Sequence, residues 1–264
     1  MLEIAIEAAR QAGQVLLAEF GKSQEIRFKG LRDIVTQVDL VAQAKAVEVI
    51  RSRYPDHDIL GEELGQTPGG ASDYCWIVDP LDGTTNYSRG YPCFSVSIAL
   101  SYRGEVILGV VYDPLRDQLF RAQRGQSAYL NDEKIRVSAV DRLIDALVGL
   151  DWAHKQELRS KMARLVAEVA PKVGTLRNTG SAALGLCSVA AGWTDAYFHL
   201  SLKPWDAAAA SVIIQEAGGA ISDMAGLPWH PNSKGCLASN GPIHEAMLTL
   251  LTGTYLLSFA RSGP

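Results

Sequence analysis

The segment from residue 94 to residue 137 constrains the fold most, because it predicts consecutive β-strands joined by tight turns. Over residues 94–101 large apolar and small side chains alternate strictly, which is typical of a strand with one face packed on a core. Further strands and turns follow at short intervals: Arg103-Gly104 as a turn, 106–112 and 119–122 as strands, Gly125 and Asn131-Asp132 as turns, and 135–137 as a strand. Strands joined by such short turns pair antiparallel, so we predict an antiparallel meander.

Segments with helical spacing of apolar residues flank this meander on both sides. The predicted helices are, in chain order: 2–20, 39–54 with Asp39 as its cap, 158–169, 181–192, 206–217, and 242–252 with Pro242 in its first turn. Short strands are expected between the later helices. Strands followed by segregated helices indicate an α+β fold rather than a regular parallel βαβ series.

The length and the net charge of the chain limit the classes of protein to which it can belong. With 264 residues, 47% of them apolar, the chain can bury a large core without a disulfide or a structural metal. We expect one domain over 1–264 with two lobes, about 1–140 and 141–264, that meet near 138–146. The 25 basic and 29 acidic residues give a net charge of −4, which argues against binding to a nucleic-acid polymer.

The sequence also predicts a cytoplasmic protein without membrane contact. No apolar run in it approaches the length of a membrane span, and its charged N-terminus is unlike a signal peptide. The four cysteines are widely spaced and form neither a CxxC pair nor a Cys/His metal pattern. We therefore expect reduced thiols.

The most informative segment for function is Asp79-Pro80-Leu81-Asp82-Gly83-Thr84-Thr85-Asn86-Tyr87, which follows a predicted buried strand at 75–78. Asp79 and Asp82 are close enough in sequence to repel each other, and a divalent cation between them would make the pair favourable. Oxygen ligands without His or Cys suit Mg²⁺ or Mn²⁺. Turns at Gly83, Thr84 and Thr85 present backbone N–H groups suited to phosphate oxygens.

Two further acidic groups lie at the ends of predicted elements. Glu62 follows the apolar step at 59–60, and Asp206 opens the helix at 206–217. Each has a plain structural explanation, as an exposed turn and as a helix cap. Together with Asp79 and Asp82 they favour a metal site. The spacing of Asp79 and Asp82 differs from the DxDGT pattern of haloacid dehalogenase-type phosphatases, so we infer no aspartyl-phosphate intermediate.

At this point the chain resembles the inositol monophosphatase family, whose signatures it matches in order. The matching blocks are Asp33-Ile34-Val35-Thr36-Gln37-Val38-Asp39, Gly61-Glu62-Glu63, Trp76 to Tyr87, Gly180-Ser181-Ala182-Ala183, Trp205-Asp206-Ala207-Ala208-Ala209 and Glu216-Ala217-Gly218-Gly219. The resemblance runs from about residue 2 to 252. It implies a layered α/β/α/β/α sandwich, usually a homodimer, that hydrolyses phosphate monoesters with metal-activated water and is inhibited by Li⁺.

The resemblance also implies roles for individual residues. Two or three Mg²⁺ ions are expected at Glu62, Asp79, the carbonyl of Leu81, Asp82 and Asp206, with Mn²⁺ as a possible substitute. Thr84, backed by Asp39, would orient the attacking water together with Glu62. The backbone of Gly83, Thr84 and Thr85 would bind phosphate, while Asp82, Asp206 and the backbone of Ala182 would face the alcohol part of the substrate.

The chain departs from the family pattern at His199, where inositol-hydrolysing members commonly have an acidic residue. A neutral imidazole can still accept a hydrogen bond from a ring hydroxyl, whereas a cationic one would favour a second negative charge. Inositol monophosphate is therefore the leading substrate. Fructose 1,6-bisphosphate, histidinol phosphate and 3′-phosphoadenosine 5′-phosphate remain alternatives, and so does a catalytically silent, metal-binding regulatory protein.

Overall fold

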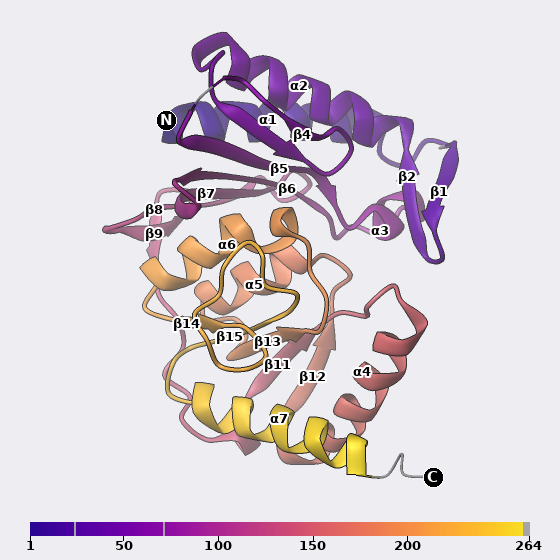
Figure 1. Ribbon diagram of the computed structural model, residues 1–264, viewed down its shortest axis with the longest axis vertical. Coiled ribbons are helices and arrows are strands. Elements are labelled where there is room, and N and C mark those ends of the chain that lie inside the picture. Colours follow the sequence, from indigo (N-terminus) through magenta and orange to yellow (C-terminus); the bar gives the residue numbers. More distant parts are fainter. Residues whose placement is uncertain (24, 71, 261–264) are drawn as a thin grey trace.

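The computed structural model describes residues 1–23, 25–70 and 72–260, and its elements stack as five alternating layers (Figure 1). Helices α1 (Leu2–Glu19) and α2 (Gln37–Arg53) form the outer layer at one end. An eight-stranded sheet, helices α5 (Ala182–Ala190) and α6 (Pro204–Glu216), and a five-stranded sheet follow. Helices α4 (Gln156–Val169) and α7 (His244–Ala260) close the other end. The predicted α+β layered sandwich is confirmed.

The eight-stranded sheet contains the predicted meander and has the order β10-β9-β8-β7-β6-β5-β3-β4. Its strands are β3 (Asp58–Gly61), β4 (Gly65–Thr67), β5 (Tyr74–Asp82), β6 (Ser95–Tyr102), β7 (Glu105–Asp113), β8 (Gln118–Gln123), β9 (Gln126–Leu130) and β10 (Glu133–Ile135). All neighbours pair antiparallel except β3 and β5, which run parallel. The last strand ends at Ile135, so the strand predicted over 135–137 is wrong in its extent.

The prediction of a single packed face for residues 94–101 is wrong. Val96, Ile98 and Leu100 do pack with α1 and α2, but the small residues on the other face are buried as well. Helix α6 covers them, and the hydroxyl of Ser97 donates to the carbonyl of Trp205 at 3.0 Å. Short side chains on this face let the helix lie close, since a Cβ added to Gly109 would come within 2.2 Å of the Ala209 carbonyl.

The second sheet has the order β12-β11-β13-β15-β14. Its strands are β11 (Leu147–Leu150), β12 (Thr175–Asn178), β13 (Ala196–His199), β14 (Ala220–Ser222) and β15 (Cys236–Ser239). Strand β11 pairs in parallel with β12 and β13, whereas β15 pairs antiparallel with β13 and β14. A separate two-stranded hairpin, β1 (Ile26–Gly30) and β2 (Asp33–Thr36), projects beside the first sheet.

Two predicted helix caps are corrected by the structure. Asp39 is not the cap of α2: Thr36 is, and Asp39 is the third helical residue, whose carboxylate accepts from the Thr36 N–H at 2.9 Å. Asp206 has the same place in α6, where its carboxylate accepts from the Lys203 N–H at 2.7 Å. Helix α7 begins two residues after Pro242 and runs to Ala260 rather than 252.

The remaining expectations concern the cysteines and membranes. All four cysteines are free thiols. Among the residues that the structure describes, no helix is both long enough and apolar enough to cross a bilayer.

Candidate active site

The end of strand β5 carries two of the predicted site residues, and the strand bulges between them. Asp79 pairs with Ser97 and Asp82 pairs with Ser95, so three steps along β5 match two along β6. A bulge of one extra residue re-aims the side chains that follow it. Ordinary strand alternation would place positions three apart on opposite faces. The bulge changes this alternation, and the carboxylate of Asp82 is turned toward helix α5 of the middle layer.

The side chain of Asp82 connects the first sheet to helix α5. Its carboxylate accepts from the backbone N–H of Ala182 at 3.2 Å and of Ala183 at 2.8 Å, and from the hydroxyl of Ser181. These groups are the start of α5, where the helix dipole favours an anion. The contact brings together the two blocks, 79–87 and 180–183, that the sequence analysis singled out separately.

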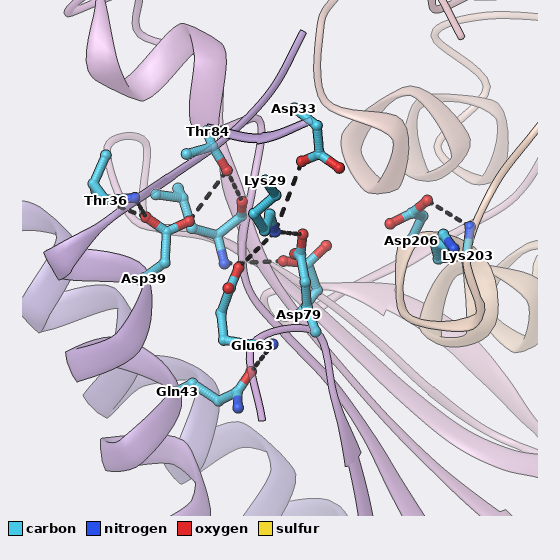
Figure 2. A network of polar contacts seen from close by, with 12 residues as sticks. Lys29, Asp33, Thr36, Asp39, Gln43, Glu63, Asp79, Thr84, Lys203 and Asp206 are labelled. Atoms are coloured by element: carbon cyan, nitrogen blue, oxygen red, sulfur yellow. Dashed lines mark hydrogen bonds and ion pairs between the residues drawn. The ribbon is translucent and has the colours of Figure 1, made fainter. Parts of the chain in front are cut away.

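Glu62 lies at the same edge because β3 and β5 are parallel neighbours, so their carboxyl ends meet. Its backbone N–H donates to the carbonyl of Val78 at 3.1 Å. Its side chain pairs with Lys29 of the β1–β2 hairpin, whose ammonium is 2.6 Å from Glu62 and 2.9 Å from Glu63. Figure 2 shows Lys29 between Asp33, Glu63 and Asp79. The lysine thus supplies positive charge at the acidic edge.

The carboxylates at this edge are held in unfavourable electrostatic surroundings. Burial, then repulsion from Glu62, Asp82 and Asp206, raises the pKa of Asp79 well above its usual value. Burial likewise raises the pKa of Asp206, with Asp82 and Glu62 adding to it. For Glu62, burial raises the pKa to about 7 although Lys29 opposes the shift. Buried carboxylates that repel one another are stabilised by a cation among them.

A divalent metal therefore fits the chemistry of these residues, which are all oxygen donors of the kind Mg²⁺ prefers. As the side chains stand, no three carboxylate, His or Cys groups of the described residues converge on one point. Two of the carboxylates are engaged elsewhere: Asp82 accepts from the start of α5, and Asp206 accepts from the N–H of Lys203 at the start of its own helix α6. Figure 2 shows Asp206 at the start of α6, apart from the group around Asp79.

Thr84 and Asp39 are brought together, as the family resemblance implies. The Thr84 hydroxyl lies 3.2 Å from the Asp39 carboxylate and 3.1 Å from the carbonyl of Leu81. The other oxygen of Asp39 accepts from the hydroxyl of Thr36 at 2.6 Å. Asp39 is buried, and burial raises its pKa. Its two oxygens are thus committed to Thr36 and Thr84, which fixes the orientation of the Thr84 hydroxyl.

The backbone at Gly83 takes a conformation that favours glycine. Gly83 has φ +98°, and a Cβ there would come within 3.0 Å of the Cys93 carbonyl and 3.1 Å of the Gly180 carbonyl. It precedes the short helix α3 (Thr84–Ser88), which has no side-chain cap. Thr85 is exposed, while Thr84 is partly buried. The binding of phosphate by the backbone of this turn stays a prediction.

His199 lies at the end of β13 and is buried, 4% exposed. Its Nδ1 accepts from the Ser201 N–H at 3.0 Å, and the ring also hydrogen-bonds to the backbone of Trp152. Burial lowers its pKa to about 4, so the ring is neutral at physiological pH. The neutral form weighs against a cationic attraction to a second phosphate. A substrate contact would have to displace one of these internal hydrogen bonds, so this role stays a prediction.

Three residues that the sequence analysis gave no role in the site are important for its geometry. The hydroxyl of Ser181 donates to Asp82, and the carboxylate of Glu63 accepts from Lys29. Asp151 is buried at the end of β11 and accepts from the Gly180 N–H at 2.6 Å. Its signal was available, because Asp151 follows the short apolar strand Leu147–Leu150 just as Asp79 follows 75–78.

Comparison with known proteins agrees with the resemblance to the inositol monophosphatase family. The model of the inositol monophosphatase family matches residues 1–254. The protein named Nus factor SuhB of Vibrio cholerae is 42% identical over 243 residues, which cover 91% of each chain. The crystal structure of the extragenic suppressor protein SuhB from Bartonella henselae superposes with a TM-score of 0.91 at 35% identity, covering 94% of this chain and 97% of that one. An IMPase from Thermotoga maritima gives a TM-score of 0.88 at 33% identity, covering 96% and 97%.

Proposed function

The chain belongs to the inositol monophosphatase family, and from this premise we propose that it is a phosphatase of small polyol or sugar phosphate monoesters. Inositol monophosphate is the leading substrate. The observation that carries the proposal is the acidic edge of Glu62, Asp79, Asp82 and Asp206, where burial and then repulsion among the carboxylates raise the pKa of Asp79 and of Asp206. Thr84 and Asp39 are hydrogen-bonded to each other beside this edge. Such an edge suits divalent cations and a phosphate dianion together.

In this proposal Glu62, Asp79, Asp82, Asp206 and the carbonyl of Leu81 would hold two or three Mg²⁺ ions, or Mn²⁺ in their place. When bound, such ions lower the pKa of water, neutralise phosphate charge and stabilise the leaving alkoxide. Thr84 would orient the attacking water together with Glu62, since Asp39 fixes the Thr84 hydroxyl. The N–H groups of Gly83, Thr84 and Thr85 would bind phosphate oxygens, and Li⁺ would inhibit by competing for one cation position.

The direct test of this proposal is the variant Asp82→Asn. It keeps the size of the side chain and one acceptor for the start of α5, but removes the negative charge. We expect the Mg²⁺-dependent rate on inositol 1-phosphate to fall by at least about 10²-fold, with an unchanged far-UV circular dichroism spectrum. Asp73→Asn is the control, because Asp73 pairs with Arg103 on the surface. An Asp82→Asn variant as active as the control would disprove the proposed metal role.

Substrate choice is tested by a panel of inositol 1-phosphate, fructose 1,6-bisphosphate, histidinol phosphate and 3′-phosphoadenosine 5′-phosphate. The panel is measured on the wild type and on His199→Glu, which restores the acidic residue common in inositol-hydrolysing members. A shift of preference toward inositol 1-phosphate in the variant would support a substrate contact at position 199. Identical selectivity would leave His199 as a structural residue.

A second candidate is a non-enzymatic role, because similar curated proteins bear the name Nus factor rather than an enzyme name. In that case the protein would act by binding a macromolecular partner and would not need the carboxylate edge. The two roles separate in a strain that lacks the gene. Full restoration of its phenotype by Asp82→Asn would favour the binding role, and failure would favour catalysis.

We also propose that the protein is a homodimer. Light scattering on the protein as it elutes from a size-exclusion column measures its molar mass and tests this proposal.

A further inference from the structure

Helix α2 carries a wholly buried polar side chain, Gln43, that has no role in the chemistry proposed above. Gln43 lies four residues after Asp39, and residues four apart share one face of a helix. Both side chains therefore point from α2 toward the acidic edge, as Figure 2 shows. Asp39 contacts the Thr84 hydroxyl there, whereas Gln43 reaches a different part of the same edge.

The amide of Gln43 contacts the turn that follows β3. Its Oε1 accepts from the backbone N–H of Glu63 at 2.9 Å. The preceding N–H, that of Glu62, donates to the carbonyl of Val78 in β5 at 3.1 Å. The peptide groups before and after Glu62 are thus held by different elements, one by β5 and the other by α2. Because these two planes define the φ and ψ angles of Glu62, the two hydrogen bonds fix the direction in which its side chain leaves the backbone.

The turn has room for this amide because the residue before Glu62 is a glycine. A Cβ added to Gly61 would come within 2.7 Å of Nε2 and 2.9 Å of Oε1 of Gln43. The amide therefore lies directly against the glycine backbone, and a glycine at the end of a strand permits such a close approach. Gly61 and Glu63 both contact the same side chain, and Glu62 lies between them.

The backbone donor sets the orientation of the Gln43 amide and leaves its other end unpaired. With Oε1 and Nε2 exchanged, an N–H₂ group would face the Glu63 N–H, and neither could accept. In the observed orientation the buried Nε2 has no hydrogen-bond partner within the described part of the chain, which costs stability. An apolar side chain would remove this unpaired donor but leave the Glu63 N–H unpaired instead. Glutamine therefore brings little net gain in folding stability, and what it adds is control of the turn.

We propose that Gln43 is a positioning residue for the metal site, which holds the turn after β3 so that the carboxylate of Glu62 stays at the acidic edge. This proposal rests on the phosphatase activity proposed above, in which Glu62 binds Mg²⁺. Gln43 acts through the backbone of Glu62 and Glu63 rather than on the metal or the substrate. Its loss should therefore weaken metal binding and leave the chemical step unchanged at saturating metal.

The test measures Mn²⁺ binding without substrate, from the electron paramagnetic resonance signal of the free ion, since Mn²⁺ takes the same oxygen ligands as Mg²⁺. Gln43→Met keeps the length of the side chain and removes the acceptor, whereas Gln43→Glu keeps an acceptor oxygen. We expect the Kd for Mn²⁺ to rise about tenfold or more in Gln43→Met and to stay within about threefold of the wild type in Gln43→Glu. The Mg²⁺ concentration for half-maximal hydrolysis of inositol 1-phosphate should rise in parallel in Gln43→Met, with kcat at saturating Mg²⁺ unchanged.

Asn240→Leu is the matched control for a general loss of stability. Asn240 is also a buried amide, and its Oδ1 accepts from the backbone N–H of Ile243 at 3.4 Å, beside the second sheet. Its loss should lower the free energy of unfolding in urea and leave the Kd for Mn²⁺ at the wild-type value.

The direct measurement of metal binding separates this proposal from the phosphatase proposal. Weaker Mn²⁺ binding in Gln43→Met and its recovery in Gln43→Glu support the positioning role even if no phosphate ester is hydrolysed, in which case only the phosphatase proposal fails. The positioning proposal is overturned if Gln43→Met binds Mn²⁺ like the wild type, if Gln43→Glu binds as weakly as Gln43→Met, if Asn240→Leu loses as much affinity, or if the wild type binds no Mn²⁺.

Discussion

Asp151 accepts a hydrogen bond from the backbone N–H of Gly180 at 2.6 Å, which ties the end of β11 to the turn that contacts Asp82. The same carboxylate accepts from the amide of Asn178 and from the hydroxyl of Tyr197, each at 2.9 Å. Burial raises its pKa to about 6. One buried acid of the second sheet thereby positions Ser181 and Ala182 against an acid of the first sheet.

We therefore predict that Asp151→Asn weakens both stability and catalysis. The asparagine places an N–H₂ group among N–H and O–H donors, so at least one of them loses its acceptor. The free energy of unfolding should fall by about 2 kcal/mol, as for a lost hydrogen bond to a charged group. The value of kcat should fall about tenfold with a smaller change in KM, because the orientation of Asp82 changes.

Urea unfolding and steady-state kinetics measure both effects of Asp151→Asn. Asp145→Asn is the control, since Asp145 pairs with Arg142 on the surface. A variant that loses stability but keeps the wild-type kcat would show that Asp151 supports the second sheet alone. In that case its proposed influence on Asp82 would be wrong.

A second prediction concerns Lys29, the cation at the acidic edge. Burial acts to lower the pKa of Lys29, but attraction and hydrogen bonds to Glu62 and Glu63 outweigh it and raise the pKa, so the ammonium stays charged. Lys29→Met leaves these carboxylates unpaired. In EDTA the melting temperature should fall by a few degrees, at about 2–4 °C per kcal/mol for a chain of this size. Saturating Mg²⁺ should recover most of the loss, because it supplies positive charge at the same carboxylates.

Differential scanning calorimetry with EDTA and with Mg²⁺ measures this interaction. Lys45→Met is the matched control, because Lys45 forms an exposed pair with Glu48 at 3.1 Å. The control should lose little in either condition. An equal loss for Lys29→Met with and without Mg²⁺ would contradict a shared position for the lysine and the metal.

Much of the acidic edge could be predicted from the sequence because its residues follow apolar strands or begin helices. Asp79 lies near the end of one short apolar strand, Glu62 directly follows another, and Asp206 lies in the first turn of α6. These are local relations between a residue and its own element. The periodicity that predicted the meander and the helices is local in the same sense.

The relations that could not be predicted connect segments far apart in the chain. Alternation over 94–101 suggested one solvent-facing side, but small residues there serve equally to admit α6 against the sheet. The contact of Asp82 with the start of α5 links positions about a hundred residues apart, and no sequence pattern encodes that pairing. The bulge between Asp79 and Asp82 depends on the register with β6, which only the folded sheet defines.

A third prediction compares two glycines in the left-handed region. Gly83 has φ +98° and is surrounded by the carbonyls of Cys93 and Gly180, whereas Gly125 has φ +79° and no atom within 4 Å of the place that a Cβ would take. Alanine at either site strains the backbone by about 1–2 kcal/mol. Only at Gly83 must the neighbouring segments move, and these segments hold the site. Gly83→Ala should therefore lower kcat/KM about tenfold or more, while Gly125→Ala keeps the wild-type value. Equal kinetics in two folded variants would show that the turn tolerates a side chain.

The last prediction is a pH dependence of stability that originates at His199. Its pKa is about 4 in the folded protein, against 6.5 when unperturbed, so between these values the unfolded chain binds a proton that the folded chain excludes. The stabilisation that comes from the neutral His199 ring is therefore fully present above pH 6.5, and it is lost as the pH falls from 6.5 through 4. Between pH 7 and pH 5 the free energy of unfolding should decrease by about 2 kcal/mol from this residue.

His199→Gln removes the titrating group while keeping a hydrogen-bonding side chain, so it isolates this contribution. We expect the variant to be less stable than the wild type at pH 7, because the amide fits the Ser201 N–H and the Trp152 backbone less well. The difference between the two proteins should shrink by about 2 kcal/mol at pH 5. His230→Gln is the control, since His230 is an exposed residue whose Nδ1 likewise accepts from a backbone N–H, that of Asn232 at 3.1 Å. Urea unfolding at both pH values measures the change, and a difference that is the same at pH 7 and pH 5 would mean that His199 is already protonated or not buried in solution.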